Sequence, residues 1–372
     1  MSEREPSFVM NQSEMERAER HGLSPRELEL RELKDDFIHH FAPNAQEAAR
    51  KRFAGESLSN EDQSLFDRAR NKWWFDKYGF PHARVQERVE VLTRKYMVSE
   101  DLTRRRDLQR GLFEAVRKKN VARVNELRGL YEKEFPEQME GVVALLDFPS
   151  YLSLQKKVGH FSFNTRTPEG REERKEAIQS LTQYHFLLSH FVEQNSDDKA
   201  FLEDFWYTIE QLGVTADNLR QAQITRSGIV SQVAAYKIFK QLGQHPQLSH
   251  PREDAFEAID MWSDADTAIQ VKTGKRGSDE LIVATDTIAF PGVESKVGDA
   301  VTHVNTDLMR DIARFTTKSA AYGEKIGKKI RGYYAVIPKQ TFDHVTGEPS
   351  EEIVERFRER LGIAQTTHHD GA

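Results

Sequence analysis

The hydrophobic pattern of this chain changes near Arg226, and that change limits the possible folds more than any other feature of the sequence. Before Arg226, apolar residues recur three or four positions apart over long stretches, as in Leu108 and Leu112. This spacing is typical of amphipathic helices, which bury such a stripe. After Arg226, short strand-like segments alternate with helical ones. We therefore predict an all-helical region over residues 1–225 and a second domain over residues 226–372 that contains a sheet.

Helix start signals support the helical interpretation of the first region. Thr167-Pro168-Glu169 predicts the start of a long helix, because threonine caps helices and proline suits their first turn. Asp197-Asp198 predicts another start. The stretch over residues 136–168 is less regular, since Gly141 and Pro149, among others, interrupt it. We predict a connection there, either within one helical region or between two helical subdomains.

The second region mixes helices with strands, which places the chain in the α+β or α/β class. Glycine and proline separate its segments, and β-branched and aromatic residues fill the expected strands. We predict helices over residues 228–242, 303–322 and 351–361, and strands over residues 256–262, 267–273, 281–290 and 332–338. We expect a short disordered tail over residues 366–372.

A polar pair in one of these strands marks a candidate site. Gln270 and Lys272 are two positions apart, so they point to the same face of their strand, while Ile269 and Val271 point to the other. Asp260 lies in the preceding strand, across an expected hairpin turn. If the register of the hairpin is right, the carboxylate of Asp260 lies near the polar pair.

Such a cluster suits a hard divalent cation and the hydrolysis of a phosphodiester. The Asp260 carboxylate, the Gln270 amide oxygen and the Val271 backbone carbonyl form an oxygen-rich ligand set of the kind that Mg²⁺ or Mn²⁺ prefers. Lys272 can position or activate a water molecule and offset the charge of a phosphate under attack. The alternative is that Asp260 and Lys272 form an ordinary cross-strand charge pair.

This order of elements and motif resembles the restriction-endonuclease-like, or PD-(D/E)XK, nuclease superfamily, in a variant with Gln in place of Glu similar to Mrr-like domains. The resemblance covers residues 226–361. It matches Asp260 to the metal-binding aspartate, Gln270 to the second motif residue and Lys272 to the motif lysine. Gln232 falls where a helix of this superfamily often carries a catalytic Glu, and Glu253 or Asp254 would compensate in part.

The resemblance implies an αβββαβ domain with a mixed central sheet and a Mg²⁺-dependent nuclease that acts on DNA. We expect the helical region to bind DNA, a protein partner or a second copy of the chain. The alternative is a catalytically inactive descendant that serves as a DNA-binding module or a protein-interaction scaffold. Gln232 and Gln270, which stand where carboxylates are usual, favour that alternative.

Basic residues are concentrated in two places despite a formal net charge of −6. That net charge argues against a protein that coats nucleic acid all over, but not against a local basic groove. Residues 310–331 contain seven basic and two acidic residues. We predict phosphate contacts from the residues that directly follow Lys272 and from this basic run; the candidates are Lys275, Arg276, Lys318, Lys325, Lys328 and Lys329. The alternative for the run is a solvated helix end, where cations are favoured.

Other features exclude several classes of protein. The chain has no cysteine, which rules out disulfides, thiolate metal sites and a thiol nucleophile. The first forty residues lack the apolar core of a signal peptide, and no stretch is long and apolar enough to span a membrane, so we expect a cytoplasmic protein. His185 and His190 lie in an aromatic helical stretch, where we expect structural or surface roles.

Overall fold

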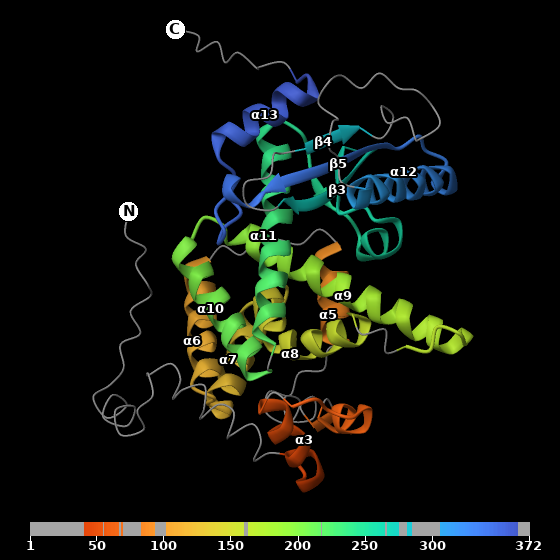
Figure 1. Ribbon diagram of the computed structural model, residues 1–372. Coiled ribbons are helices and arrows are strands. Elements are labelled where there is room, and N and C mark those ends of the chain that lie inside the picture. Colours follow the sequence, from red (N-terminus) through yellow and green to blue (C-terminus); the bar gives the residue numbers. More distant parts are fainter. Residues whose placement is uncertain are drawn as a thin grey trace.

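The structure is a computed structural model of the full chain, in which a helical part and a part built on a sheet lie one above the other (Figure 1). It describes residues 41–54, 56–66, 68–69, 83–93, 102–159, 163–216, 218–264, 266–274, 281–284 and 306–363. The expected tail over residues 366–372 lies outside these ranges. No helix in the described ranges is long and apolar enough to cross a membrane.

Two helices of the helical part, α9 and α10, begin where the sequence signals predict. Thr167 caps α9 by accepting a hydrogen bond from the Gly170 amide at 3.1 Å, and Asp198 caps α10 by accepting one from the Phe201 amide at 2.9 Å. The helices are α3 (Pro43–Phe53), α5 (Ala83–Thr93), α6 (Leu102–Arg117), α7 (Val121–Glu134), α8 (Glu140–Gly159), α9 (Pro168–Gln194), α10 (Lys199–Thr215) and α11 (Leu219–Gln241).

The predicted connection over residues 136–168 is wrong for most of its length, because α8 occupies Glu140–Gly159. Nearly every residue of α8 from Glu140 to Ser153 is buried, so the helix has no polar face and shows no amphipathic period. Pro149 removes one backbone hydrogen-bond donor inside it. Tertiary packing on all sides outweighs that loss, since packing rather than propensity supplies most helical stability in proteins.

Helix α11 joins the two parts, and it crosses the predicted boundary at residue 226. It begins at Leu219 rather than near Gly228, and it runs from the helical bundle to the sheet (Figure 1). One hydrophobic core continues along it from Trp206 of the bundle to Met261 and Phe357 of the second part. The two parts therefore share a core and are not independently packed.

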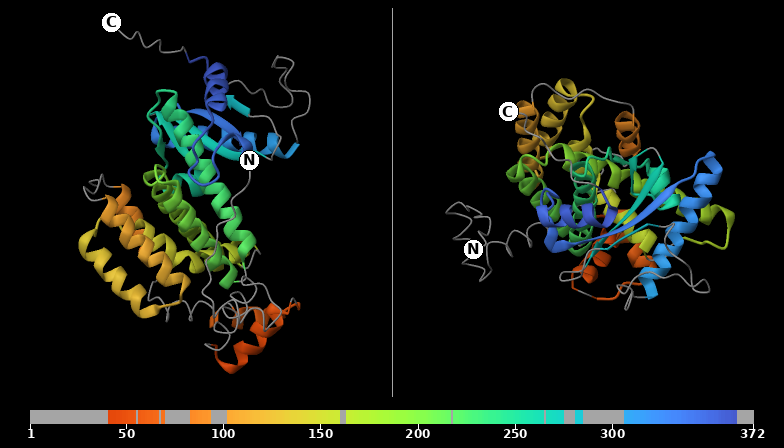
Figure 2. Two further views of the ribbon diagram at one scale, coloured as in Figure 1. Left: turned by 90° about the vertical axis from the view of Figure 1, so that its left-hand side faces the viewer. Right: turned by 90° about the horizontal axis from the view of Figure 1, so that it is seen from above.

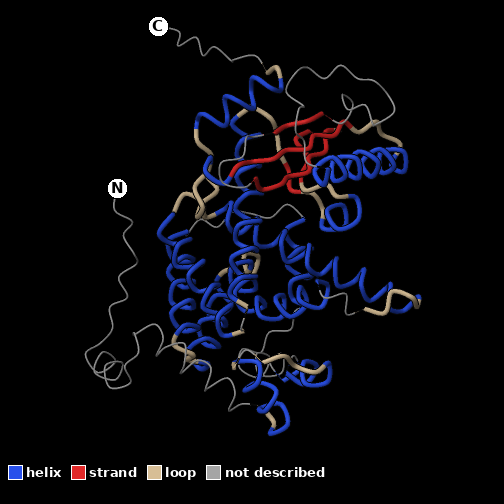
Figure 3. Tube along the Cα trace, viewed as in Figure 1, coloured by secondary structure: helices blue, strands red, loops and turns tan. Residues whose placement is uncertain are grey.

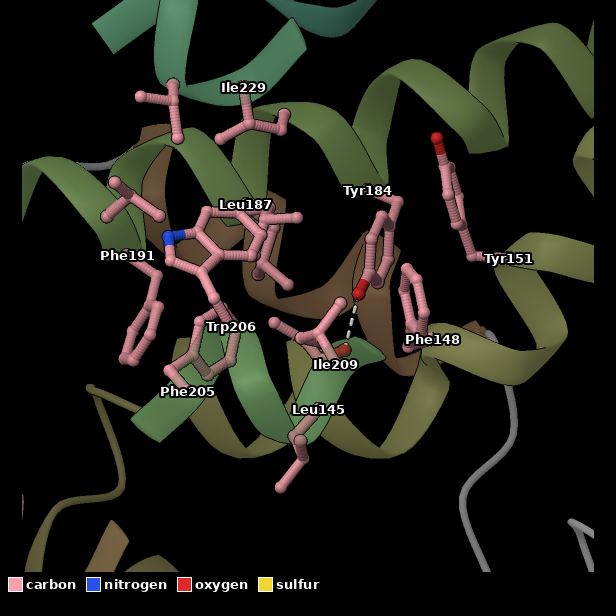
Figure 4. Packing of buried hydrophobic residues seen from close by; sticks show 14 of the residues in the cluster. Leu145, Phe148, Tyr151, Tyr184, Leu187, Phe191, Phe205, Trp206, Ile209 and Ile229 are labelled. Atoms are coloured by element: carbon pink, nitrogen blue, oxygen red, sulfur yellow. Dashed lines mark hydrogen bonds between the residues drawn. The ribbon is translucent and has the colours of Figure 1, made fainter. Parts of the chain in front are cut away.

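The bundle side of this core is dense with aromatic rings. In Figure 4, Phe205, Trp206 and Ile209 of α10 lie close to Leu187 and Phe191 of α9. The Phe191 and Phe205 rings are 4.6 Å apart between centroids, within the range of favourable aromatic pairs.

The described strands form one mixed sheet in the order β1-β2-β3-β5-β4 (Figure 3). Strands β3 and β5 pair in parallel, and the other pairs are antiparallel. The chain is thus of the α+β class. Its elements are β1 (Gln247–Leu248), a π-helical turn η1 (Glu253–Glu257), β2 (Met261–Asp264), β3 (Thr267–Gly274), β4 (Leu281–Ala284), α12 (Thr306–Ile326), β5 (Arg331–Pro338), η4 (Lys339–Thr341) and α13 (Glu351–Leu361).

Helices cover both faces of the sheet (Figure 2). Ile269 and Val271 of β3 belong to the core shared with α11 and α13, while Ala268 packs with Ile312 and Phe315 of α12. The alternation of side chains along β3 is therefore as predicted, and Gln270 falls on the α12 face with Ala268.

The predicted strand over residues 256–262 is wrong except at its last two residues. Residues Glu253–Glu257 form η1 instead, and Ala258 adopts a left-handed conformation with φ of 60° that turns the chain before β2 begins at Met261. The other predictions fare better. Strands β3 and β5 and helices α12 and α13 lie where they were predicted, and β4 covers the first four residues of the strand over 281–290, the rest of which lies outside the described ranges.

The close approach of α8 and α9 generates a prediction about Gly141. A Cβ atom at this position would lie 2.3 Å from the Phe191 ring and 2.6 Å from Nε2 of Gln109, too close for either to remain in place. We expect Gly141→Ala to lower the free energy of unfolding by about 1–3 kcal/mol, as overpacked cores do. Urea denaturation followed by circular dichroism measures the change.

Gly159→Ala is the matched control in the same helix. Nothing lies within 4 Å of its Cβ position, so we expect no loss of stability and a gain of up to about 1 kcal/mol from helix propensity. Equal effects of the two substitutions would contradict this packing of α8 against α9.

Candidate functional site

Asp260 lies directly before β2 and faces Gln270 of β3. The hairpin pairs Met261 with Ile269 and Trp262 with Ala268, so the next position in this register places Asp260 opposite Gln270. The Asp260 amide still donates to the Ile269 carbonyl at 2.9 Å. The predicted proximity of Asp260 and Gln270 is therefore present in the structure.

Two donors of β3 hold one oxygen of the Asp260 carboxylate. Nε2 of Gln270 donates to Oδ2 of Asp260 at 2.9 Å, and the Val271 amide donates to the same oxygen at 2.6 Å. The Val271 amide lies beyond the end of β2, because the chain turns away at Ala258 and offers no backbone carbonyl there. The Asp260 carboxylate accepts its hydrogen bond instead. The backbone carbonyl of Val271 as a metal ligand stays a prediction.

Asp254 is the second carboxylate at this position. It projects from η1, and its carboxyl group lies close enough to that of Asp260 for each to shift the pKa of the other. Glu253, the other compensating residue proposed from the sequence, bonds elsewhere: it accepts from Nε1 of Trp262 at 3.2 Å and from the Tyr322 hydroxyl at 2.8 Å. The structure thus brings Asp254, and not Glu253, to the site.

Burial raises the pKa of both Asp254 and Asp260. For Asp254 the Asp260 carboxylate raises the pKa further, while Lys272 lowers it. For Asp260 the burial effect is opposed by Lys272 and by the donors Val271 and Gln270. Two neighbouring carboxyl groups in a partly buried site cannot both ionise easily, so we expect this pair to share a proton.

Gln232 holds the site from the α11 side. Its Nε2 donates to the backbone carbonyl of Asp260 at 3.2 Å, and its Oε1 accepts from the Ser189 hydroxyl of α9 at 2.7 Å. Both polar ends of this amide are therefore bonded to the protein. Gln232 connects the helical part to Asp260 and fixes the position of its backbone.

These residues line a cavity of about 430 Å³ between α9, α11, β3 and α12. One wall carries the two carboxyl groups, and the exposed Lys272 lies beside them. Helix α12 contributes Asp311, Arg314 and Lys318 to the lining. The charged and polar lining consists of His185, Ser231, Gln232, Asp254, Asp260, Gln270, Lys272, Thr273, Asp311, Arg314 and Lys318.

Among the predicted phosphate-binding lysines in the described ranges, Lys318 lines this cavity. Its Nζ donates to the Phe256 carbonyl of η1, and burial together with the neighbouring Arg314 lowers its pKa. Lys325 lies over the Tyr322 ring and Lys328 lines a separate groove near Trp262. Lys329 is exposed and lines neither. Lys275 and Arg276 lie outside the described residues.

Three titratable cavity residues were not among the predicted site residues: His185, Asp311 and Arg314. Arg314 precedes Lys318 by four positions, and residues four apart share a helix face. That spacing is a signal that could have identified it. No local signal singles out His185, because its place in the cavity depends on how α9 packs beside the sheet.

The donor set suits a hard cation better than a soft one. The carboxyl groups of Asp254, Asp260 and Asp311 and the Gln270 amide line the cavity, and the described residues contain no cluster of three or more His, Cys, Asp or Glu side chains that would hold a metal ion. Scans of this chain against protein-family models, curated proteins and solved structures gave no match. The interpretation of the site therefore depends on its own geometry.

The shared proton of Asp254 and Asp260 generates a prediction about pH. A carboxyl group whose pKa is raised by folding stabilises the folded state at low pH, and this contribution is lost as the pH rises through the raised pKa. An Asn side chain at position 254 can still donate a hydrogen bond to the Asp260 carboxylate through its NH₂ group, but it has no carboxyl group that titrates. We expect Asp254→Asn to raise the free energy of unfolding at pH 8 by about 1 kcal/mol, with a smaller gain at pH 4.

Chemical denaturation at several pH values measures this difference. Asp264→Asn, at the exposed end of β2, is the control, for which we expect no pH-dependent gain. A gain from Asp254→Asn that is the same at pH 4 and pH 8 would contradict the shared proton.

Proposed function

We propose that this protein is a divalent-cation-dependent nuclease that hydrolyses phosphodiester bonds in DNA, with Mg²⁺ or Mn²⁺ as cofactor. One observation carries the proposal: Asp254, Asp260, Gln270 and Lys272 line one cavity together with the basic side chains Arg314 and Lys318 of α12. Carboxylates that hold a cation, a lysine beside them and facing cations form a site suited to a phosphate under attack.

The arrangement of elements supports the restriction-endonuclease-like part of this proposal. Helix α11, strands β2, β3 and β4, helix α12 and strand β5 follow one another in the order αβββαβ, with the short β1 added between α11 and η1. The candidate site lies at the β2–β3 hairpin, between the helix that precedes the strands and the helix that follows them. The order of elements is compatible with many functions, so the function is argued from the site.

The residues of the cavity fit a hard cation. Asp254 and Asp260 share a proton that a cation would replace, and the side-chain oxygen of Gln270 would complete an oxygen ligand set. Once bound, Mg²⁺ or Mn²⁺ would polarise the phosphate and lower the pKa of a bound water molecule.

The protein's own residues have separate roles in this proposal. The Gln270 and Val271 donors and the Gln232 amide keep Asp260 in place. Lys272 would orient the attacking water and offset the charge that develops on the phosphate. On α12, Arg314 and Lys318 would hold the phosphate groups of the strand, which fix its position without reading its sequence.

The catalytic assignment predicts a loss of cleavage in two single variants. We expect Asp260→Asn and Lys272→Ala each to lower the rate of plasmid cleavage in Mg²⁺ by at least about 100-fold, because positioned acid–base and charged groups contribute roughly 10²–10⁴-fold. Asp264→Asn, outside the cavity, should cleave at the wild-type rate. Wild-type rates in both site variants would contradict the assignment.

The cavity wall on α12 predicts a change in the salt dependence of DNA binding. Removal of one phosphate-binding cation lowers the steepness of log K against log salt by roughly 0.7–0.9. We expect Arg314→Ala/Lys318→Ala to lower this slope by about 1–2, measured by fluorescence anisotropy without divalent cations. Lys328→Ala/Lys329→Ala removes the same charge just after α12, and an equal decrease there would show that the basic run acts as a whole.

A catalytically inactive DNA-binding or protein-interaction scaffold is the second candidate. The observation that favours it is that Oδ2 of Asp260 and both polar atoms of Gln232 are already occupied by hydrogen bonds within the protein. Titration of the protein with Mn²⁺ by calorimetry separates the two candidates, since a scaffold would show salt-dependent DNA binding but neither binding of the cation nor cleavage.

A further inference from the structure

His185 is a cavity residue supplied by the helical part of the chain. It lies on α9, and its side chain lines the same cavity as Asp254, Asp260 and Lys272. None of the roles proposed above uses it. The question is therefore what an imidazole from the helical part does at the wall of the candidate site.

A hydrogen bond with Tyr151 holds the ring of His185 in one orientation. Its Nε2 forms a hydrogen bond with the Tyr151 hydroxyl of α8, which also lies 3.3 Å from Oγ1 of Thr225 on α11. Tyr151 in turn stacks on Tyr184, with ring centroids 4.3 Å apart. Figure 4 shows these two tyrosines side by side, and the Tyr184 hydroxyl bonds to the Ala144 carbonyl of α8. Contacts that involve α8, α9 and α11 therefore hold the imidazole in place.

Burial sets the charge of the imidazole, and the direction of its hydrogen bond with Tyr151 sets its tautomer. Burial lowers the pKa of His185 to about 4, so the ring is neutral at pH 7. Burial raises the pKa of Tyr151, whose hydroxyl therefore keeps its proton. Where the Tyr151 hydroxyl accepts from Oγ1 of Thr225, it donates to Nε2 of His185 and the imidazole proton lies on Nδ1; with the reverse directions the proton lies on Nε2. The contact proposed below requires the first arrangement.

Nδ1 of His185 makes no hydrogen bond within the described part of the chain. Gly228 of α11 also lines this cavity, and among the described residues no atom outside its own helix backbone lies within 4 Å of the position that a Cβ would take there. A ring with one nitrogen fixed by the protein and a donor on the other is organised in advance for a ligand acceptor.

We propose that Nδ1–H of His185 donates a hydrogen bond to an oxygen of the nucleic-acid strand in the cavity, so that the helical part completes the site. This inference rests on the proposed function and adds a binding contact to it. A neutral donor suits this place, because it neither repels a cation at the carboxyl pair nor competes with it for the carboxylate oxygens. The strand would then lie between α9 and α12.

Two substitutions of different length test the proposal. By chain length, Asn places its amide where Nδ1 lies and loses the bond to Tyr151, whereas Gln reaches the position of Nε2 and keeps that bond. A ligand contact through Nδ1 predicts that His185→Asn retains function and His185→Gln does not. A purely structural role predicts the opposite order.

The first measurement is binding of a fluorescein-labelled single-stranded oligonucleotide in EDTA, followed by cleavage in Mg²⁺. We expect His185→Gln and His185→Ala to bind about 10-fold more weakly, the loss typical of one hydrogen bond to a charged acceptor, and His185→Asn to stay within about threefold of the wild type. Thermal unfolding of each variant by circular dichroism identifies any that fail to fold.

Outcomes that defeat this inference differ from those that defeat the proposed function. A wild-type protein that binds the oligonucleotide without cleaving it removes the nuclease assignment and leaves the His185 contact testable by binding. Tight binding by all three variants, or rescue by Gln alone, overturns the His185 contact and leaves the nuclease assignment standing. Two-dimensional ¹H–¹⁵N NMR of the free wild type supplies a readout that needs no ligand: an Nε2-protonated His185 at pH 7 would also overturn the proposal.

Discussion

The hydrogen bond between the Asp260 carboxylate and the Val271 amide is the contact on which the candidate site depends. It closes the end of the hairpin where β2 stops and β3 continues, and it fixes the carboxyl group that Gln270 and Asp254 also contact. An amide left unpaired there would cost free energy, so the bond has a structural value of its own. The same bond holds a partly buried acidic group at the edge of the cavity, where the proposed cation would bind.

Helix α11 makes the site a property of the whole chain. It packs against the sheet through one half and against α9 and α10 through the other, and Gln232 on it bonds to both Asp260 and Ser189. The cavity therefore has walls from the bundle and from the sheet, and a substrate would contact both. A simpler hypothesis is that the helical part only binds a partner protein. That hypothesis gives no role to His185, which lines the cavity and is bonded to Tyr151.

The success of the sequence predictions follows from how each element is buried. Strands β3 and β5 were predicted because short apolar runs bounded by turn residues suit buried strands. Helix α13 was predicted because one face is polar and the other apolar. Helix α8 was missed because it is buried on all sides and carries Pro149. The strand over residues 256–262 was wrong except at its last two residues, because a left-handed residue, Ala258, interrupts a pattern that suits an extended chain.

The sequence by itself determined which side chains of β3 share a face and placed Asp260 across a turn from Gln270, because strand alternation and hairpin pairing are local rules. Only the tertiary structure decided that Asp254 rather than Glu253 meets Asp260, and that Arg314 and His185 reach the same cavity. Those contacts join residues on different elements, and their distances depend on how a π-helical turn, α9 and α12 pack around the sheet. No local pattern encodes that packing, since it is set by the shared core along α11.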